Sequence, residues 1–282
     1  MGVGSKQVYP ACLGAANVLA AATVKRNYVR MAAIYDAIGR TYRRTRQPDP
    51  RIGEAIAAAV RDCASLLNVG AGTGSYEVKK EQLVALEPSL TMIKQRPPEA
   101  APVVCGRAEA LPFADKSFDA VSCILTVHHW SDRPQGMAEC SRVARKRVVF
   151  FTIDPEALNS FWLFDYFPEI INVDRKVLPS FDSFAGAFAS MTVQNVMIPE
   201  DCRDGFLGAF WKRPHAFLDE SVRAGISTFA RLKPEELESG LHCLRNDLES
   251  GAWQVRYPEL TALHELDLGY RIVSCEPRSA IC

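Results

Sequence analysis

Residues 66–75 read Leu66-Leu67-Asn68-Val69-Gly70-Ala71-Gly72-Thr73-Gly74-Ser75, and this stretch decides the fold of the 282-residue chain. Its first four residues predict a buried strand, and the three alternate glycines let the backbone turn sharply and approach a ligand. A second apolar strand, residues 83–86, ends at Glu87, thirteen residues after Gly74. A glycine turn after one strand and an acid at the tip of the next predict a nucleoside site in a doubly wound sheet, where a carboxylate meets the ribose hydroxyls.

Short apolar strands alternate with helical segments through the first half of the chain. Apolar residues recur at helical spacing over residues 25–46 and 52–64, and Ser89 is a plausible N-cap for a helix after Pro88. This alternation predicts an α/β fold with a parallel sheet and helices on both faces. Beyond residues 66–69 and 83–86, the expected strands are residues 103–105, 120–125, 147–153, 193–198 and 270–275.

The pattern divides the chain into four parts. Residues 1–30 form an N-terminal extension, expected to be helical or disordered, and residues 31–154 form the nucleoside-binding core. Aromatic clusters in residues 155–230 predict a helical cap, and residues 231–282 are expected to complete the sheet.

Composition limits the classes of partner. Lys plus Arg and Asp plus Glu number 33 each, so no global field steers the protein toward nucleic acid or an anionic membrane. No apolar run reaches the ~18–20 residues of a membrane span. The nine cysteines are scattered without a Cys-x-x-Cys pair, which indicates reduced thiols, a cytoplasmic location and no structural zinc.

A second block of sequence identifies a family resemblance. Residues 104–113 read Val-Cys-Gly-Arg-Ala-Glu-Ala-Leu-Pro-Phe, and Asp115-Lys116-Ser117-Phe118-Asp119-Ala120-Val121 follows. With the glycine loop and Glu87, this block resembles the class I S-adenosylmethionine-dependent methyltransferases, most closely the small-molecule group that includes ubiquinone/menaquinone-pathway and trans-aconitate methyltransferases. The resemblance covers residues 31–153. It implies a Rossmann-like methyltransferase fold with seven strands and a helical cap insertion, with S-adenosylmethionine as cofactor and S-adenosylhomocysteine as product.

The resemblance also implies a set of cofactor contacts. Gly70, Ala71 and Gly72 would pass beneath the methionine part, and Glu87 would hold the ribose hydroxyls. Leu125 and Thr126 would lie beside the transferable methyl group. The adenine pocket would be formed by Pro88, Met92, Ala108 and Glu109.

Two further parts of the sequence bear on the cofactor contacts. The residue before Ala108 is often acidic in the family but is Arg107 here, which leaves backbone contacts or Glu109 to meet the adenine amine. In the N-terminal segment, Tyr42 and Arg46 match a Tyr-x-x-x-Arg pattern of related enzymes, and Arg46 could form a planar fork with the cofactor carboxylate. The alternative for Arg46 is a surface arginine.

His128-His129-Trp130 follows the expected fourth strand, where open α/β sheets place their ligand crevice. His129 is the candidate catalytic residue, because histidine can take a proton from a substrate near neutral pH. Either histidine could instead orient the loop, and adjacent histidines without a spaced carboxylate do not predict a metal. Further on, the aromatics Trp162, Tyr166, Phe206 and Trp211 predict either a lid over an apolar or aromatic acceptor or the core of the cap itself, with Asp201, Arg203 and Asp204 as its polar contacts.

The sequence thus predicts transfer of a methyl group to a small-molecule oxygen, nitrogen or carbon acceptor. Two alternatives stay open. One is a catalytically silent protein that binds S-adenosylmethionine without turnover. The other is an NAD-dependent oxidoreductase, against which the early third glycine and the Ala-Glu-Ala-Leu-Pro-Phe block both argue.

Overall fold

A computed structural model describes residues 46–278, without the side chains of residues 159 and 160. The expected extension 1–30, most of the expected helix 25–46, and Tyr42 lie outside the described residues.

The main sheet has seven strands in the order β3-β2-β1-β4-β5-β9-β6. Strands β1 to β5 pair in parallel, and β9 runs antiparallel to both of its neighbours, β5 and β6. The predicted doubly wound, seven-stranded, mostly parallel sheet is therefore confirmed. The strands are β1 Ser65–Val69, β2 Gln82–Glu87, β3 Val103–Cys105, β4 Phe118–Ile124, β5 Ala144–Ile153, β6 Ser190–Asn195 and β9 Tyr270–Glu276, and a small second sheet pairs β7 Ile198–Pro199 with β8 Glu265–Leu266.

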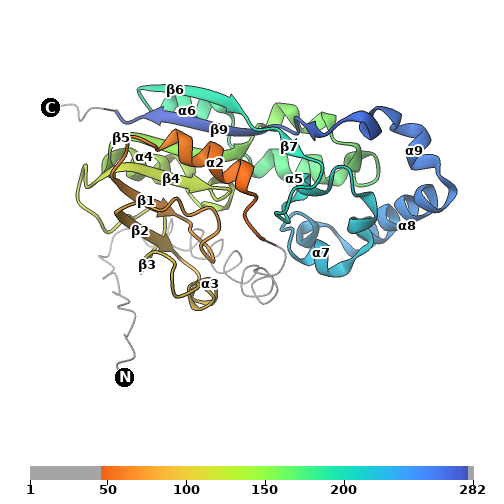
Figure 1. The fold of residues 1–282 in the computed structure, drawn as a ribbon, viewed down its shortest axis with the longest axis horizontal. Coiled ribbons are helices and arrows are strands. Elements are labelled where there is room, and N and C mark those ends of the chain that lie inside the picture. The colour runs from red at the N-terminus through yellow and green to blue at the C-terminus, as the bar shows by residue number, and fades with distance from the viewer. Residues whose placement is uncertain (1–45, 279–282) are drawn as a thin grey trace, which may run out of the picture.

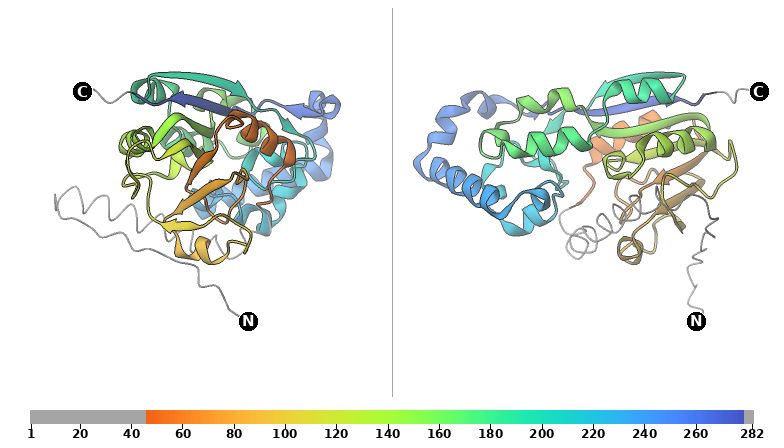
Figure 2. Two further views of the ribbon diagram at one scale, coloured as in Figure 1. Left: turned by 60° about the vertical axis from the view of Figure 1, so that its left-hand side comes forward. Right: turned by 180° about the vertical axis from the view of Figure 1, so that it is seen from behind.

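Helices cover both faces of the sheet. Figure 1 shows α2 on the near face, and the view from behind in Figure 2 brings α4 and α6 to the front. Helix α2 begins at Pro50, directly after its N-cap Asp49. The Asp49 side chain accepts a hydrogen bond from the backbone N–H of Arg51. The α-helices are α2 Pro50–Ala59, α3 Leu90–Lys94, α4 Arg133–Val143, α5 Glu169–Val177, α6 Phe181–Ala187, α7 Glu220–Ala224, α8 Pro234–Ser250 and α9 Ala252–Arg256.

Successive residues of the central strands point into two different cores. Leu66 and Val149 pack with α2 on one face, whereas Leu67 and Val148 pack with α4 and α6 on the other. Successive side chains of a strand point to opposite faces of its sheet, so all of them are buried when helices cover both faces. This explains why every residue of β1 is buried, although apolar and polar residues do not alternate along it.

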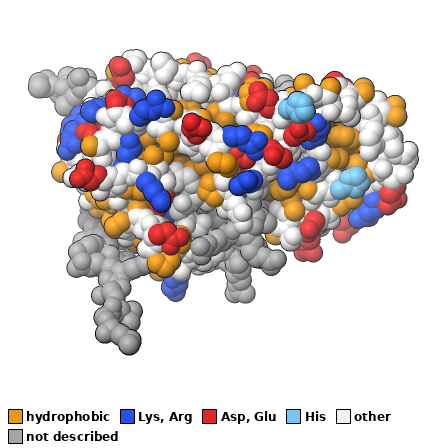
Figure 3. Space-filling model, in the orientation of Figure 1, with side chains coloured by type: hydrophobic (Ala, Val, Ile, Leu, Met, Phe, Trp, Pro, Cys, Tyr) orange, Lys and Arg blue, Asp and Glu red, His pale blue; other side chains and the backbone are white. Residues whose placement is uncertain are grey.

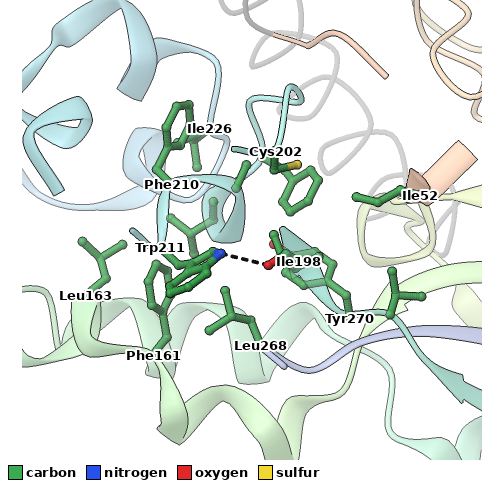
Figure 4. Close-up of a cluster of buried hydrophobic side chains, with 14 of the residues drawn as sticks. Ile52, Phe161, Leu163, Ile198, Cys202, Phe210, Trp211, Ile226, Leu268 and Tyr270 are labelled. Carbon is green, nitrogen blue, oxygen red and sulfur yellow. Dashed lines mark hydrogen bonds between the residues drawn. The ribbon is translucent and has the colours of Figure 1, made fainter. Parts of the chain in front are cut away.

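The core on the α2 face continues into the cap, which lies beyond one end of the sheet in Figure 1. Trp162 and Trp211 are buried in this shared core, and their indole N–H groups donate to the carbonyls of Trp211 (2.6 Å) and Ile198 (2.9 Å), respectively. Figure 4 shows Trp211 and Ile198 among the buried side chains, with Tyr270 of β9 beside them. The cap and the sheet therefore share one hydrophobic core.

The expected cap region, residues 155–230, includes segments that return to the sheet. Helix α6 packs against α4, and β6 forms the sheet edge beside β9. The strand expected at residues 193–198 is two strands, β6 and β7, because the chain leaves the main sheet between them. Helix α2 ends at Ala59, five residues before the expected end, where the backbone closes a turn from Cys63 N to Val60 O.

Charged side chains of both signs are interspersed on the face shown in Figure 3, as the equal numbers of acidic and basic residues predict. Within residues 46–278, no helix is long and apolar enough to span a bilayer.

Candidate functional site

A cavity of about 880 Å³ lies at the carboxyl ends of β1, β2 and β4. This is where an open α/β sheet places its ligand, because the turns after the parallel strands meet there. The structure brings together in this cavity every predicted site residue that it describes: Arg46, Gly70, Ala71, Gly72, Glu87, Pro88, Met92, Ala108, Glu109, Leu125, Thr126 and His129.

The glycine loop is held against β2 by two backbone hydrogen bonds. The N–H groups of Gly70 and Ala71 donate to the carbonyl of Leu86 at 2.8 and 3.1 Å. Gly70 and Gly72 both have positive φ, +69° and +53°. A Cβ on Gly72 would meet no heavy atom within 4 Å, and this residue lines the cavity. The backbone here is therefore exposed for close approach by a ligand.

Glu87 stands at the end of β2 with only 6% of its surface exposed. Its Oε2 accepts a hydrogen bond from the N–H of Gly72 at 2.8 Å, and its Oε1 accepts one from the N–H of Ser89 at 2.9 Å. Burial raises the pKa of the Glu87 carboxyl, while the two backbone hydrogen bonds act in the opposite direction. The carboxylate thus joins the glycine loop to the start of α3 at the cavity wall.

An ion pair that no sequence pattern predicted contacts the glycine loop. Arg96 Nη2 lies 2.5 Å from Oε1 of Glu77, and the two side chains are 1% and 8% exposed. Arg96 Nη1 also donates to the carbonyl of Gly72 at 3.3 Å. This buried ion pair therefore contacts the glycine loop at Gly72. Arg96 and Glu77 lie 19 positions apart, and no local pattern connects them.

The end of β4 carries backbone strain at the cavity. Leu125 has φ +50°, a left-handed conformation that costs a residue with a side chain about 1 kcal/mol or more. Both Leu125 and Thr126 line the cavity, and Thr126 is 7% exposed. Strained residues cluster at functional sites, which agrees with the predicted position of these two beside the reacting group.

Glu109 is already engaged through one carboxylate oxygen. Its Oε1 accepts hydrogen bonds from the N–H of Ser131 (2.8 Å), the hydroxyl of Ser131 (2.7 Å) and the N–H of Asp132 (3.2 Å). This side chain therefore ties the turn after β3 to the start of α4. The carboxylate bridges two walls of the cavity, and a contact from Ala108 or Glu109 to adenine stays a prediction.

Arg46 forms a two-contact ion pair with Asp204 of the loop after β7. Arg46 Nε lies 2.7 Å from Oδ1 and Nη2 lies 3.3 Å from Oδ2, although the residues are 158 positions apart. The Asp204 side chain is fully buried and that of Arg46 is 11% exposed. Arg46 is thus a cavity residue rather than a solvated surface arginine, and a contact from it to the cofactor carboxylate stays a prediction.

His128 and His129 follow β4 in a short 3-10 helix, Val127–His129, and both line the cavity. Burial lowers the pKa of His128 to about 3, and the positive charges of Arg231, Arg46 and Arg133 act in the same direction. Burial, His128 and Arg231 also hold the pKa of His129 well below its usual value. Both imidazoles are therefore neutral at physiological pH, and each is a weaker base than a solvated histidine.

Three cations at the far end of the cavity were not predicted. Arg133 begins α4, Lys176 lies near the end of α5, and Arg231 ends the 3-10 helix Phe229–Arg231. Arg133 Nη1 donates to the carbonyl of Val177 at 2.6 Å and so connects α4 to α5. These residues come from segments far apart in the sequence, and no spacing pattern marked them.

The aromatic side chains of the cap do not line this cavity. Trp162, Tyr166, Phe206 and Trp211 are at most 6% exposed and belong to the shared core. The core alternative therefore holds for all four. Trp130 does line the cavity and also packs edge-on against Phe150, with ring centroids 6.2 Å apart. No group of three or more His, Cys, Asp or Glu side chains in residues 46–278 could hold a metal ion.

The protein has a doubly wound α/β fold with a cavity at the carboxyl ends of its parallel strands, and comparison with known proteins identifies the family. The profile of a family described as "Methyltransferase domain" matches residues 67–152. A solved structure from Anabaena variabilis ATCC 29413, described as a candidate methyltransferase of an antibiotic biosynthesis pathway, is 35% identical with a TM-score of 0.75. The similarity covers 82% of this chain and 98% of that one. This chain belongs to the class I S-adenosylmethionine-dependent methyltransferases.

Curated relatives match over shorter stretches. The biotin biosynthesis bifunctional protein BioHC of Cellvibrio japonicus is 30% identical over 144 residues, which cover 48% of this chain and 28% of that protein. Demethylmenaquinone methyltransferase of Roseiflexus castenholzii is 31% identical over 132 residues, 43% of this chain and 56% of that protein. The chain therefore matches less than two thirds of the length of these relatives.

Proposed function

We propose that this protein transfers the methyl group of S-adenosylmethionine to an oxygen, nitrogen or carbon atom of a small-molecule acceptor. The observation that carries the proposal is the continuity of one cavity. Glu87 and the glycine loop lie on its wall together with Leu125, Thr126 and His129. A cofactor held by the first group would present its reactive end to an acceptor beside the second.

The residues present fit this cofactor. A buried carboxylate at the end of β2 is suited to two neighbouring hydroxyls, because each oxygen can accept a hydrogen bond. The open Cβ position of Gly72 leaves room for a ligand against the loop backbone. Pro88 and Met92 add an apolar wall next to Glu87, as an adenine ring requires.

The bound cofactor would supply a methyl group already activated by its positively charged sulfur. The protein then has to align the acceptor, exclude water and receive a proton if the acceptor carries one. The neutral imidazole of His129 can accept a proton, but its lowered pKa makes it a weak base. An acceptor atom that needs little activation, such as an amine or an ionised oxygen, therefore fits the site best.

We also propose that the protein works in the cytoplasm. The cysteines Cys63, Cys105, Cys123, Cys140, Cys202, Cys243 and Cys275 within the described residues are free thiols. Free thiols are typical of a reducing compartment.

Parallel calorimetric titrations with S-adenosylmethionine, S-adenosylhomocysteine and NAD test the cofactor. Binding of the first two without NAD supports the proposal, and labelled methyl donor then identifies acceptors. Binding of NAD alone would favour an oxidoreductase. Binding of S-adenosylmethionine without transfer to any member of a broad acceptor panel would favour the catalytically silent alternative.

A further inference from the structure

Three cationic side chains lie at the far end of the cavity. Arg133, Lys176 and Arg231 line it, and within residues 46–278 none of the three forms an ion pair. Arg231 lies close enough to His128 and His129 to lower the pKa of both. The three cations come from α4, α5 and the segment before α8, so they converge on one space from three different elements.

The carboxylates on the cavity wall form no ion pairs with these cations in the described residues, and their oxygens accept hydrogen bonds from other groups. Glu87 accepts from the N–H groups of Gly72 and Ser89. Glu109 accepts from the turn at Ser131, and Asp132 caps α4 by accepting from the N–H of Gln135 at 3.0 Å. None of these three carboxylates forms an ion pair with Arg133, Lys176 or Arg231 in the part of the chain that the structure describes.

Two further cations line the cavity, Arg46 and Arg107, and neither belongs to this group of three. Arg46 is paired with Asp204, and Arg107 precedes Ala108 beside the predicted adenine site. A buried carboxylate, Asp174 of α5, is near enough to Arg231 to be affected by its charge, but Asp174 does not line the cavity. Its side chain accepts from the hydroxyl of Thr228 at 3.3 Å.

One more group at this end lacks a partner. Nδ1 of His128 is buried and has no hydrogen-bond partner among the residues described. Buried polar atoms are nearly always paired in folded proteins, with ligands or water where protein groups are missing. A neutral imidazole nitrogen near Arg231 and Arg133 is the pattern expected of a subsite that is completed by a polar ligand.

We infer that this subsite binds an anionic oxygen group of the methyl acceptor, a carboxylate or a phosphate, with Arg231 and Lys176 as its principal partners and Arg133 beside them. Guanidinium groups match both anions through paired hydrogen bonds. Because α5 and the segment around Arg231 belong to the cap region, the subsite adds an acceptor determinant to a cavity whose other end is formed by the sheet. The inference deepens the proposed function and rests on it.

Calorimetry on protein saturated with S-adenosylhomocysteine tests the subsite with three probes of similar shape: benzoate, phenyl phosphate and benzamide. We expect at least one anionic probe to bind about tenfold or more tightly than neutral benzamide, since charge-assisted hydrogen bonds are stronger than hydrogen bonds between neutral groups. The stronger anion, benzoate or phenyl phosphate, identifies the group. Equal binding of all three probes, or no binding of either anion, would overturn the inference.

Variants of the cations test whether these side chains bind the acceptor or the cofactor. Arg231→Gln and Lys176→Gln should each weaken anion binding about tenfold and leave the affinity for S-adenosylhomocysteine within about twofold. Arg175→Gln is the matched control, because Arg175 is an exposed cation of α5 outside the cavity wall, and it should change neither. If Arg231→Gln instead weakens S-adenosylhomocysteine, the cations serve the cofactor carboxylate and the inference is wrong. If wild-type protein fails to bind S-adenosylhomocysteine, the proposed function fails, whereas anion binding to the free protein can still be measured.

Discussion

Gly70 and Thr126 are packed so closely that no side chain fits between them. A Cβ on Gly70 would lie 2.0 Å from Oγ1 and 2.7 Å from Cβ of Thr126. This contact joins the turn after β1 to the end of β4, the two places where the cofactor and the reacting methyl group are predicted to lie. The requirement for glycine at this position is therefore steric as well as conformational, since φ is +69°.

Replacing Gly70 with alanine should destabilise the protein by about 3 kcal/mol or more, from the left-handed backbone and the overlap with Thr126. Gly72→Ala is the matched comparison: φ is +53° but the Cβ would have open space, so the cost should be about 1 kcal/mol. Urea unfolding of both variants measures the difference. Adding Thr126→Gly should recover a large part of the Gly70→Ala loss, and strict additivity of the two changes would contradict the contact.

Glu87→Ala should weaken S-adenosylmethionine binding by about 1–3 kcal/mol, because the ribose hydroxyls and the N–H of Gly72 lose their acceptor. Glu81→Ala, at an exposed position just before β2, is the control and should leave the affinity unchanged. Calorimetric titration of both variants makes the measurement. An unchanged affinity in Glu87→Ala would mean that the ribose lies elsewhere.

The ion pair of Arg46 and Asp204 should contribute far more than the neighbouring pair of Arg51 and Asp201. Asp204 has a fully buried side chain, so Asp204→Asn removes a buried negative charge that faces Arg46 and should cost about 3 kcal/mol of unfolding free energy. Arg51 Nη1 lies 2.8 Å from Asp201 Oδ1, but the side chains are 49% and 75% exposed. Asp201→Asn should therefore cost less than about 1 kcal/mol. Equal losses in the two variants, measured by denaturant unfolding, would show that burial does not control these pairs.

The features of the fold that were predicted from the sequence are those that a local residue pattern marks. The strands flanking the glycine loop were found from apolar runs and turns, and the N-cap of α3 was found from one residue, since Ser89 Oγ does accept from the N–H of Met92 at 3.2 Å. Motif resemblance supplied the residues that line the cavity at the sheet end. These features depend on neighbours within a few positions, where sequence order and spatial order agree.

What escaped prediction depends on contacts between distant segments. The pairs Arg96–Glu77 and Arg46–Asp204 have no spacing signature, and the latter spans 158 residues. A strand was expected at residues 193–198, but the position of β6 at the sheet edge and the packing of α6 against α4 were not predicted, because both depend on segments distant in the sequence. Arg231 reaches the cavity only through the packing of the cap. Each of these features is set by tertiary packing, which a single sequence does not display.

Asp174 should make stability depend on pH in a defined direction. Burial raises the pKa of Asp174 from 3.8 to about 6, with Arg231 and Thr228 acting in the opposite direction. A carboxyl whose pKa is raised on folding stabilises the native state below its unfolded pKa, and that contribution is lost as the pH rises through the folded pKa. Wild-type protein should therefore lose stability relative to Asp174→Asn between pH 4 and pH 7, by roughly 2 kcal/mol.

Urea unfolding of both proteins across that range measures the difference. Asp182→Asn, at an exposed position of α6, is the matched control for replacing an aspartate with asparagine. Asparagine keeps an oxygen to accept the hydrogen bond of Thr228, so the Asp174→Asn change tests the buried charge rather than the loss of that bond. If the wild type and Asp174→Asn differ by a constant amount from pH 4 to pH 7, Asp174 ionises equally in the folded and unfolded chains, and the carboxylate beside Arg231 is not a desolvated one.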